Sequence, residues 1–439
     1  MAMMVLIGAP ASGQGKTTVT AGIARAFVQQ GKRVRVFKAG PDFIDPFWLT
    51  NASDAPVYQL DTWMVGEEGC QALLADAAQV ADVILVEGVM GLHDGTPSSA
   101  DLACLLDLPV LLLIDACAMA QTFGALVYGL ANYDTRVNCI GVIANRVNSD
   151  GHAQLLIDSL RGDVRWMGRV ASDPDMVLPE RHLGLVMFDQ HQETTQKLDC
   201  IARQVSLHLE LALPSVVPLA VSQPKPEKYL HGIRIGIARD AAFCFLYQAN
   251  LDLLCSMGAE LVFFSPCQGD RLPNIDSVYL PGGYPELHLS VLEKNVLLKQ
   301  DLHAHVNAGK PLLAECGGLL YLCSSLQFMA GSIGHMAGII NATAFVHESL
   351  TAIGSQQGAF PNGILRGHTF HHASIQWHEQ PTRHAQGRTG NKGEAILERQ
   401  RLTASFVHWY FPSCPQAAAA LFLPSNALIH QNISTSTTE

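Results

Sequence analysis

The sequence predicts an α/β protein built from two doubly wound domains, in which helices cover both faces of a sheet. Short apolar runs alternate with helix-like stretches in both halves of the chain, and a segment rich in proline and polar residues separates the halves. The length of 439 residues also exceeds the roughly 250 to 300 residues at which a single hydrophobic core stops growing. Two domains are therefore expected.

The first half has the pattern of a mostly parallel sheet. Its apolar runs are expected to be strands, and they lie at residues 4–8, 33–40, 82–88, 109–116 and 139–147. Helix-like stretches lie between them, for example at 17–31 and 120–133. Continuous apolar strands separated by helices are typical of a parallel sheet that is buried on both faces.

The segment 213–229 interrupts this rhythm, because it is rich in proline and polar residues, and we place a linker there. A second cycle of apolar runs then follows, at residues 232–240, 259–266, 277–283 and 311–318. The predicted organisation is a first domain at 1–212, a linker at 213–230, a second domain at 231–425 and a disordered tail at 426–439.

The composition is that of an ordinary globular protein, with 48% hydrophobic and 15% charged residues. A formal net charge of -11 argues against nucleic acid or an anionic membrane as a partner, because both require a basic surface. The 11 cysteines form no CxxC pair and the N-terminus lacks a signal-peptide pattern, so a reduced, cytoplasmic protein is expected. The oligomeric state stays open, with a homodimer as one alternative.

A glycine-rich stretch after the first expected strand, GAPASGQGKTTVT at residues 8–20, has the pattern of a phosphate-binding loop. Small residues let backbone N–H groups surround phosphate oxygens, a lysine adds positive charge, and a hydroxyl can bind Mg²⁺. The predicted phosphate-site residues are Ser12, Gly13, Gly15, Lys16, Thr17 and Thr18. The strict pattern would place a glycine where this chain has Pro10, and an ordinary glycine turn is the alternative.

Acidic residues follow two further strands of the same predicted sheet. Lys38, Asp42 and Asp45 lie in the loop after the second strand, and Glu87 ends the third. The carboxyl ends of parallel strands meet at one edge, where open α/β sheets bind ligands. We therefore predict a magnesium site formed by Thr17, Asp45 and Glu87. The alternative for each acid alone is a solvated loop carboxylate.

A second candidate site lies in the other half of the chain. In PLLAECGGLLYL, Cys316 follows an apolar strand and precedes two glycines and an expected amphipathic helix. This is the pattern of a nucleophile elbow, in which a tight turn exposes the thiol and the helix N-terminus is expected to lower its pKa. We interpret Cys323, on the expected helix, as a core residue.

A thiol nucleophile also needs a base and an oxyanion site. His408 follows a late apolar strand and is the predicted base, while the backbone N–H groups of Gly283 and Tyr284 are the predicted oxyanion donors. Four more histidines lie in the run LRGHTFHHASIQWH, namely His368, His371, His372 and His378. They lack a closed set of four zinc ligands, so we favour structural or substrate contacts over a metal site.

Five segments of the first half resemble one family. They are KAGPDFIDP, QLDTWM, EGVMGLHDGTPSSADLA, GVIANRV and PERHLGL, and they are similar to the synthetase domain of the cobyrinic and hydrogenobyrinic acid a,c-diamide synthases, a dethiobiotin-synthetase-like P-loop domain. The resemblance implies that the phosphate loop and the acids hold ATP and Mg²⁺, and that adenine contacts Asn145 and Arg146. It also implies that Glu180, Arg181 and His182 approach the nucleotide or the substrate, with a packing loop as the alternative.

The second half resembles the class I glutamine amidotransferases through its order of glycine loop, cysteine and late histidine. The segment IARDAAFCFLYQANLDLL is similar to the corrinoid-amidating branch. In many class I members an acid lies two residues beyond the histidine, but this chain has Tyr410 there. The group that orients the His408 imidazole therefore stays open.

Together the resemblances imply an ATP- and glutamine-dependent ligase that amidates the a and c carboxylates of a corrinoid polycarboxylate through acyl phosphates. L-Glutamine would supply the nitrogen, and cobalamin biosynthesis is the expected pathway. The predicted substrate or phosphoryl-transfer residues are Lys38, Asp42, Asp45, Arg181 and His182. Cobyrinic and hydrogenobyrinic acid, which differ in cobalt, both stay open as substrates.

Two alternatives stay open as well. Cobyric acid synthase shares both domain types but amidates four other side chains, and the compact length together with GPDFIDP and PERHLGL favours the diamide enzyme. An ATPase switch similar to ParA or MinD is the alternative from another class. Such switches usually carry a lysine at the position of Ala11 and do not need an ECGG motif.

Overall fold

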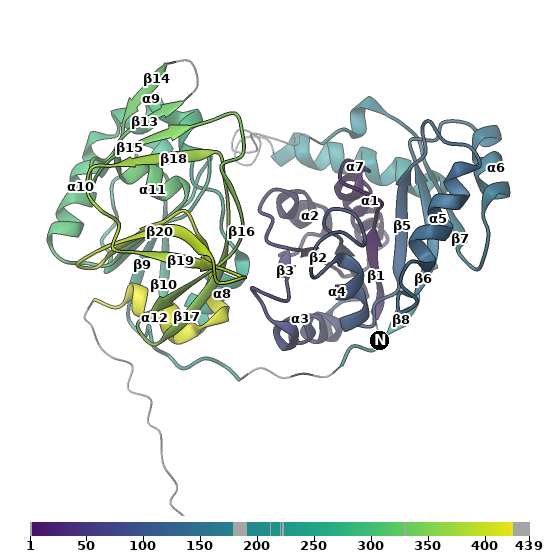
Figure 1. The fold of residues 1–439 in the computed structure, drawn as a ribbon, viewed down its shortest axis with the longest axis horizontal. Coiled ribbons are helices and arrows are strands. Elements are labelled where there is room, and N and C mark those ends of the chain that lie inside the picture. Colours follow the sequence, from purple (N-terminus) through teal and green to yellow (C-terminus); the bar gives the residue numbers. More distant parts are fainter. Residues whose placement is uncertain are drawn as a thin grey trace, which may run out of the picture. The chain divides into compact units, whose positions relative to one another are not determined.

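The computed structural model describes residues 2–178, 191–210, 212–219, 221, 224–328 and 331–424. The chain forms two compact units, Met1–Gln223 and Pro224–Glu439, and the division falls within the segment 213–230. Each unit has its own sheets (Figure 1). Each also has its own hydrophobic clusters. The predicted tail at 426–439 lies outside the described residues.

The first unit is built on an eight-stranded sheet whose main path has the order β3-β2-β4-β1-β5-β6-β7, with parallel neighbours throughout. These strands are β1 (Ala2–Gly8), β2 (Val34–Ala39), β3 (Tyr58–Leu60), β4 (Val83–Glu87), β5 (Val110–Asp115), β6 (Cys139–Asn145) and β7 (Arg165–Val170). The prediction of a mostly parallel sheet is confirmed. One further strand, β8 (Ser215–Val216), pairs antiparallel with β1, so the first unit extends into the segment predicted as linker.

Helices cover both faces of this sheet. They are α1 (Lys16–Gln29), α2 (Asp45–Ser53), α3 (Glu67–Val80), α4 (Ser99–Leu105), α5 (Thr122–Asn132), α6 (Asp150–Ser159), α7 (His191–His208) and the short 3-10 helix η1 (Pro174–Met176). In β1, Met4 and Leu6 belong to the hydrophobic cluster that includes α3, α4 and α5, whereas Val5 and Ile7 belong to the cluster of α1, α2 and α7. A strand that is buried on both faces is apolar without alternation, as its sequence shows.

The register of the sheet brings polar strand ends together. Glu87 pairs with Lys38 across β2 and β4 and with Ile7 across β1 and β4, while Asp115 pairs with Asn145 across β5 and β6. The loops that follow these strands therefore begin at the same edge of the sheet, which is the edge where open α/β folds bind ligands.

The second unit contains a ten-stranded mixed sheet with the order β10-β9-β11-β12-β21-β20-β19-β16-β17-β22. Its parallel part consists of β9 (Arg234–Ala238), β10 (Glu260–Phe264), β11 (Ser277–Leu280), β12 (Leu312–Glu315) and β21 (Leu402–Ser405). Its antiparallel part consists of β16 (Ala352–Phe360), β17 (Gly363–His371), β19 (Arg383–Gly387), β20 (Lys392–Arg399) and β22 (His408–Tyr410). A separate four-stranded sheet consists of β13 (Cys323–Phe328), β14 (Ser332–His335), β15 (Ile340–Val346) and β18 (Ala373–Trp377).

The helices of the second unit are α8 (Gln248–Ser256), α9 (Leu289–Lys294), α10 (Val296–Asn307), α11 (Gly317–Leu322), α12 (Pro415–Phe422) and the 3-10 helices η3 (Pro266–Gln268), η4 (Pro285–His288) and η5 (Phe411–Ser413). All residues of α11 are buried, so the expectation of an amphipathic helix there is wrong. Cys323 is a core residue as predicted, but it begins strand β13. Within the described ranges, no helix has the length and apolar character needed to cross a membrane.

Candidate active sites

A pocket of about 500 Å³ in the first unit contains the predicted nucleotide site. The predicted residues that line it are Ser12, Gly13, Gly15, Lys16, Thr17, Thr18, Lys38, Asp42, Asp45, Glu87, Asn145 and Arg146. Arg181 and His182, together with Glu180, lie outside the described residues. The structure thus brings the described members of the predicted set into one cavity, and their individual roles stay predictions.

Backbone conformation explains the glycines of the phosphate loop. Gly13 and Gly15 have φ values of 77° and 88°, in the left-handed region that strains residues with a side chain. A Cβ atom on Gly15 would also lie 2.5 Å from Nδ2 of Asn145. The positive φ and this close approach to the Asn145 side chain together favour glycine at position 15.

A connected cluster of polar side chains lies in this pocket. Oγ1 of Thr17 donates to Oε1 of Glu87 at 2.8 Å, and Nζ of Lys38 lies 3.0 Å from the same oxygen and 2.7 Å from Oδ2 of Asp45. Burial alone would lower the pKa of Lys38, but Glu87 and Asp45 outweigh burial and hold this pKa above its ordinary value. Lys38 therefore stays charged and holds the two carboxylates together.

Asp42, in the loop after β2, and Asp45, the first residue of α2, differ in protonation. Burial, followed by the charge of Asp45, raises the pKa of Asp42 well above its ordinary value. Burial acts on Asp45 too, but Lys38 and hydrogen bonds outweigh it and lower the pKa of Asp45. Asp42 is consequently the member of the pair that can take up a proton, while Asp45 stays ionised.

The oxygen atoms of this cluster fit a magnesium ion. Mg²⁺ prefers oxygen ligands and usually binds through one or two carboxylates, with phosphate and water completing its coordination. Oε2 of Glu87 is buried and has no hydrogen-bond partner in the part of the chain that the structure describes. Across the same residues, no group of three or more His, Cys, Asp or Glu side chains is arranged to hold a metal. A metal at Thr17, Asp45 and Glu87 would therefore depend on phosphate oxygens as further ligands.

Asn145 and Arg146, the predicted adenine contacts, lie beside the phosphate loop. Nδ2 of Asn145 donates to the Gln14 carbonyl at 2.8 Å, and its Oδ1 accepts from the N–H of Arg146 at 3.0 Å. The Arg146 guanidinium forms an ion pair with Asp115 at 2.7 Å. The side chain of Asn145 therefore makes hydrogen bonds within the fold, as a structural role would require. The same residue also lines the pocket, so a contact with a ligand stays a prediction.

Sequence reasoning missed several lining residues of the same pocket. They are Ile44, Trp48, Val89, Met90 and the segments 171–173 and 176–178. Met90 lies there because Nζ of Lys16 donates to its carbonyl at 2.7 Å, and any residue type offers that carbonyl. Trp48 carried a usable signal, since it follows Asp45 on the first turn of α2.

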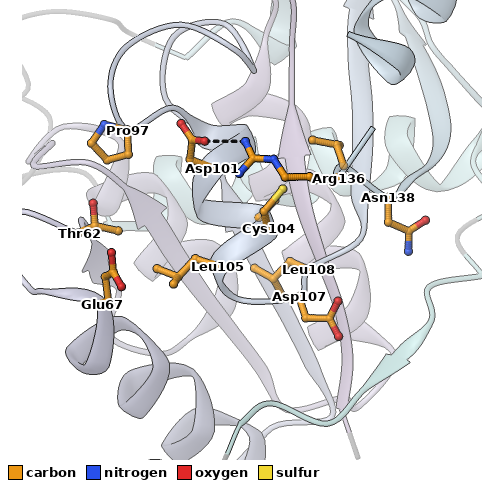
Figure 2. A pocket seen from close by; sticks show the side chains of 12 residues that line it. Thr62, Glu67, Pro97, Asp101, Cys104, Leu105, Asp107, Leu108, Arg136 and Asn138 are labelled. Atoms are coloured by element: carbon orange, nitrogen blue, oxygen red, sulfur yellow. Dashed lines mark hydrogen bonds and ion pairs between the residues drawn. The ribbon is translucent and has the colours of Figure 1, made fainter. Parts of the chain in front are cut away.

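A second pocket of the first unit, about 510 Å³ in volume, has no residue in common with the nucleotide pocket (Figure 2). Arg136 is the basic residue in its lining, and its guanidinium already pairs with Asp101 at 3.1 Å and with Asp134 at 2.5 Å. This commitment leaves the arginine poorly suited to an anionic ligand, and none of the predicted site residues lines the pocket.

In the second unit, Cys316 occupies the turn between β12 and α11. Its φ of 45° and ψ of -105° are strained for a residue with a side chain, as expected of a nucleophile elbow. Its N–H donates to the Ser405 carbonyl at 2.8 Å, which fixes the turn to the neighbouring strand. A Cβ atom on Gly282 would lie 2.3 Å from Cε1 of His408 and 3.3 Å from Cβ of Cys316. The predicted nucleophile and base therefore both border Gly282.

Burial controls the ionisation of this pair, since Cys316 is 6% exposed and His408 is 2% exposed. Burial, followed by the charge of Glu286, raises the pKa of the Cys316 thiol. Burial, followed by two neighbouring histidines, lowers the pKa of His408 to about 3. The expectation of a lowered thiol pKa is wrong as a net effect, because α11 is short and burial outweighs its N-terminus. A neutral thiol therefore faces a neutral imidazole.

The backbone donors differ in part from the predicted oxyanion pair. The N–H of Tyr284 donates to the Ala242 carbonyl at 3.0 Å, so this geometry does not support Tyr284 as a donor. The N–H of Gly317 instead hydrogen-bonds to the Cys316 side chain. A Cβ on Gly317 would lie 2.9 Å from the nitrogen of Gly283, so these two glycines are adjacent. The nucleophile-elbow rule, in which the next residue supplies an N–H, could have identified Gly317.

Two buried side chains hold the segment that carries His408. Glu315 accepts from the Trp409 N–H at 3.1 Å and from the Tyr279 hydroxyl at 2.7 Å. Asn250 donates to the Trp409 carbonyl at 2.7 Å and accepts from the Phe411 N–H at 2.8 Å. The residue before the nucleophile is thus tied to the residue after the base.

An aromatic ring packs against the predicted base, His408. Phe245 packs edge-on against His408 and against Tyr284, with ring centroids 6.0 and 5.0 Å away. Tyr410, at the position where an acid was sought, packs edge-on against Tyr247 with ring centroids 5.8 Å apart. Phe245 gives the imidazole an apolar neighbour, which agrees with the lowered pKa of His408.

The histidine run makes contacts within the fold. His368 pairs with His408 across β17 and β22, and burial lowers the pKa of His368 to about 4. Nε2 of His371 lies 3.0 Å from Oε1 of Glu394, and its ring stacks on Phe406 with centroids 3.7 Å apart. His368 and His371 therefore make contacts within the fold on β17, the strand that pairs with the strand of His408.

Comparisons with known proteins match both units. Residues 5–186 match the CobQ/CobB/MinD/ParA nucleotide binding domain, and residues 234–415 match the CobB/CobQ-like glutamine amidotransferase domain. The chain is 52% identical to a hydrogenobyrinate a,c-diamide synthase of Pseudomonas aeruginosa, over 96% of this chain and 97% of that one. A hydrogenobyrinate a,c-diamide synthase of Stutzerimonas stutzeri is also 52% identical, over 96% and 98% of the two chains. A cobyrinate a,c-diamide synthase of Herminiimonas arsenicoxydans is 44% identical, over 96% and 97%.

Proposed function

Because the chain belongs to the cobyrinate and hydrogenobyrinate a,c-diamide synthases, which carry out a glutamine-dependent amidation step of cobalamin biosynthesis, we propose that its substrate is the cobalt-free acid, hydrogenobyrinate. The observation that carries this choice is the pattern of relatives. Two hydrogenobyrinate enzymes are 52% identical to this chain, whereas the cobyrinate enzyme is 44% identical. The amidotransferase match in the second unit sets aside the ATPase switch. The 52% identity to diamide synthases over 96% of this chain favours them over cobyric acid synthase.

We propose that the pocket of the first unit binds ATP with its phosphates against the loop 12–18. The backbone N–H groups of this loop and the ammonium of Lys16 would face the phosphate oxygens. A magnesium ion at Thr17, Asp45 and Glu87 would offset phosphate charge when bound. Lys38 would keep the last two carboxylates in place, as its ion pairs at 2.7 and 3.0 Å indicate.

Amide formation requires an activated carboxylate, since a carboxylate oxygen leaves poorly. The target acid would take the γ-phosphoryl group of ATP to give an acyl phosphate and ADP, and ammonia would then displace phosphate and form the amide. The attacking nitrogen loses a proton in this step. Asp42 lies in the pocket, and its raised pKa suits a group that accepts this proton.

Ammonia would come from glutamine in the second unit. Sγ of Cys316 attacks the carboxamide carbon while the neutral imidazole of His408 takes the thiol proton. The N–H groups of Gly283 and Gly317 stabilise the oxyanion, and His408 returns the proton to the departing nitrogen. Water then hydrolyses the thioester to glutamate. The lowered pKa of His408 favours the return of the proton to the departing nitrogen, and it makes the neutral imidazole a weaker base toward the thiol.

The substrate proposal is tested by supplying purified protein with ATP, Mg²⁺, glutamine and either hydrogenobyrinic or cobyrinic acid, and by following product masses over time. The cobalt-free acid should have the higher kcat/KM and should pass through a monoamide to a diamide, where the series ends. Faster turnover of the cobalt-containing acid would move the assignment to cobyrinate. A series that continues beyond the diamide would instead indicate cobyric acid synthase activity.

A further inference from the structure

Three carboxylates lie close enough to Cys316 for their charges to act on its thiol, namely Glu286, Glu315 and Glu394. Two of them are committed within the fold. Glu315 accepts the hydrogen bonds that hold the His408 segment, and Glu394 accepts from Thr369 at 3.2 Å and contacts His371 at 3.0 Å. Glu286 is the third carboxylate, and the mechanism proposed above gives it no role.

Glu286 lies in η4, the 3-10 helix that follows the turn at Gly283. This helix packs against the nucleophile elbow, since a Cβ on Gly317 would lie 3.0 Å from Cδ of Pro285 and 2.9 Å from the nitrogen of Gly283. The charge of Glu286 also acts on the thiol of Cys244, a residue that borders the same turn, since a Cβ on Gly283 would lie 3.0 Å from its backbone nitrogen. Glu286 therefore lies beside the site at which the carboxamide is attacked.

The environment of Glu286 is that of a carboxylate without a cation. The side chain is half-buried, and burial raises its pKa to about 7. Its carboxylate accepts from its own backbone N–H, and within the ranges that the structure describes it forms no ion pair. A partly buried negative charge without a paired cation is costly, and a bound cation would offset that cost.

Glutamine carries such a cation. Free L-glutamine has an α-ammonium group four covalent bonds away from the carboxamide carbon that the thiol attacks, so its partner must lie near the nucleophile. We propose that Glu286 binds the α-ammonium group of glutamine and selects this amide over amides that lack the group. The inference rests on the proposed function, since it takes glutamine hydrolysis at Cys316 as its premise.

This contact also couples binding to activation. In the empty site the charge of Glu286 opposes formation of the thiolate at Cys316. An ammonium group beside Glu286 would neutralise that charge, so the thiol would lose its proton more easily when glutamine is bound. An amide without the ammonium group would receive no such help.

The test compares L-glutamine with glutaramate, which has the same carboxamide and carboxylate but no α-ammonium group, by measuring ammonia release. In Glu286→Gln, kcat/KM for glutamine should fall by about 10- to 100-fold, mainly through KM. The slow reaction of glutaramate should stay the same or rise, because the charge that opposes the thiolate is gone. Glu286→Asp keeps the charge and should recover part of the preference. Glu260→Gln is the matched control, because Glu260 is an exposed carboxylate of the same unit that pairs with Arg234.

Amidation with free ammonia should match the unaltered enzyme in all of these variants, which verifies folding and the first site. A Glu286→Gln variant that keeps the full preference for glutamine, or that loses both amides equally, overturns the proposal. If the unaltered protein releases no ammonia from glutamine, the proposed function itself fails, so the two failures are distinguishable.

Discussion

Glu315 connects the nucleophile to the base at the scale of a single residue. Its carboxyl group, 1% exposed, accepts from the N–H that follows His408, while its own peptide bond leads into Cys316. Burial raises the pKa of Glu315 to about 8, so the group is mainly protonated at neutral pH in the folded protein. In the unfolded chain a glutamate has a pKa of about 4.3.

This difference predicts how stability depends on pH. Between about pH 4 and pH 8 the folded state binds more protons than the unfolded state, so the contribution of Glu315 to the free energy of unfolding falls as pH rises through that window. Glu315→Gln keeps the shape and removes the titration. It should gain stability relative to the unaltered protein between about pH 5 and pH 8, by on the order of 1 to 3 kcal/mol. Urea unfolding curves of both proteins at several pH values measure this gain, and a constant difference across the range would contradict the prediction.

Single candidate site residues could be proposed from the sequence, but their ionisation could not. Cys316 and Lys16 lie in short sequence motifs, and such motifs can be identified without knowledge of the tertiary structure. The pKa of Cys316 depends on burial and on Glu286, which is far away in sequence. The prediction of Tyr284 as an oxyanion donor is not supported for the same reason. Its N–H donates to the carbonyl of Ala242, which lies on a different loop.

At the scale of elements, the nucleotide site is the product of three strand ends. β1 leads into the phosphate loop, β2 ends beside Lys38 and β4 ends in Glu87, and the parallel register places these ends next to one another. Such strands were predictable because they are continuous apolar runs. The antiparallel strands of the second unit were not, since β16 (AIGSQQGAF) mixes glycine, glutamine and apolar residues and gives no clear period.

Replacement of Lys16 or of Glu87 should disable the nucleotide site without disturbing the second unit. Lys16→Ala and Glu87→Gln should each reduce amidation with glutamine or with free ammonia by about 10²- to 10³-fold, because one phosphate or metal contact supplies a few kcal/mol in the transition state. Release of glutamate from glutamine should continue. Glu68→Gln, an exposed carboxylate on α3, is the control for surface charge. Amidation rates near those of the unaltered enzyme in both variants would show that ATP binds elsewhere.

At the scale of the whole molecule, each unit holds the described residues of its own site. The nucleotide pocket is lined by residues of Met1–Gln223, whereas Cys316, His408 and their backbone donors belong to Pro224–Glu439. The two reactions are linked chemically by ammonia, which the second unit would release and the first would consume. A division of this kind was foreseeable from the two cycles of strands and helices on either side of a proline-rich segment.

Because the two candidate sites lie in different units, Cys316→Ala should lose amidation with glutamine and keep amidation with free ammonia. The variant lacks the thiol, so it cannot form the thioester and should lose amidation with glutamine by several orders of magnitude, on the scale of about 10⁴-fold or more seen when a catalytic nucleophile is removed. Ammonium chloride at a saturating concentration should restore amide formation to the rate that the unaltered enzyme reaches with the same salt, because the residues proposed for acyl phosphate formation belong to the first unit. Cys255→Ala, an exposed cysteine of the second unit, controls for loss of a thiol. Product masses and glutamate release measure both reactions, and failure of ammonium to restore amidation would mean that Cys316 also serves the synthetase reaction and that the two sites are not independent.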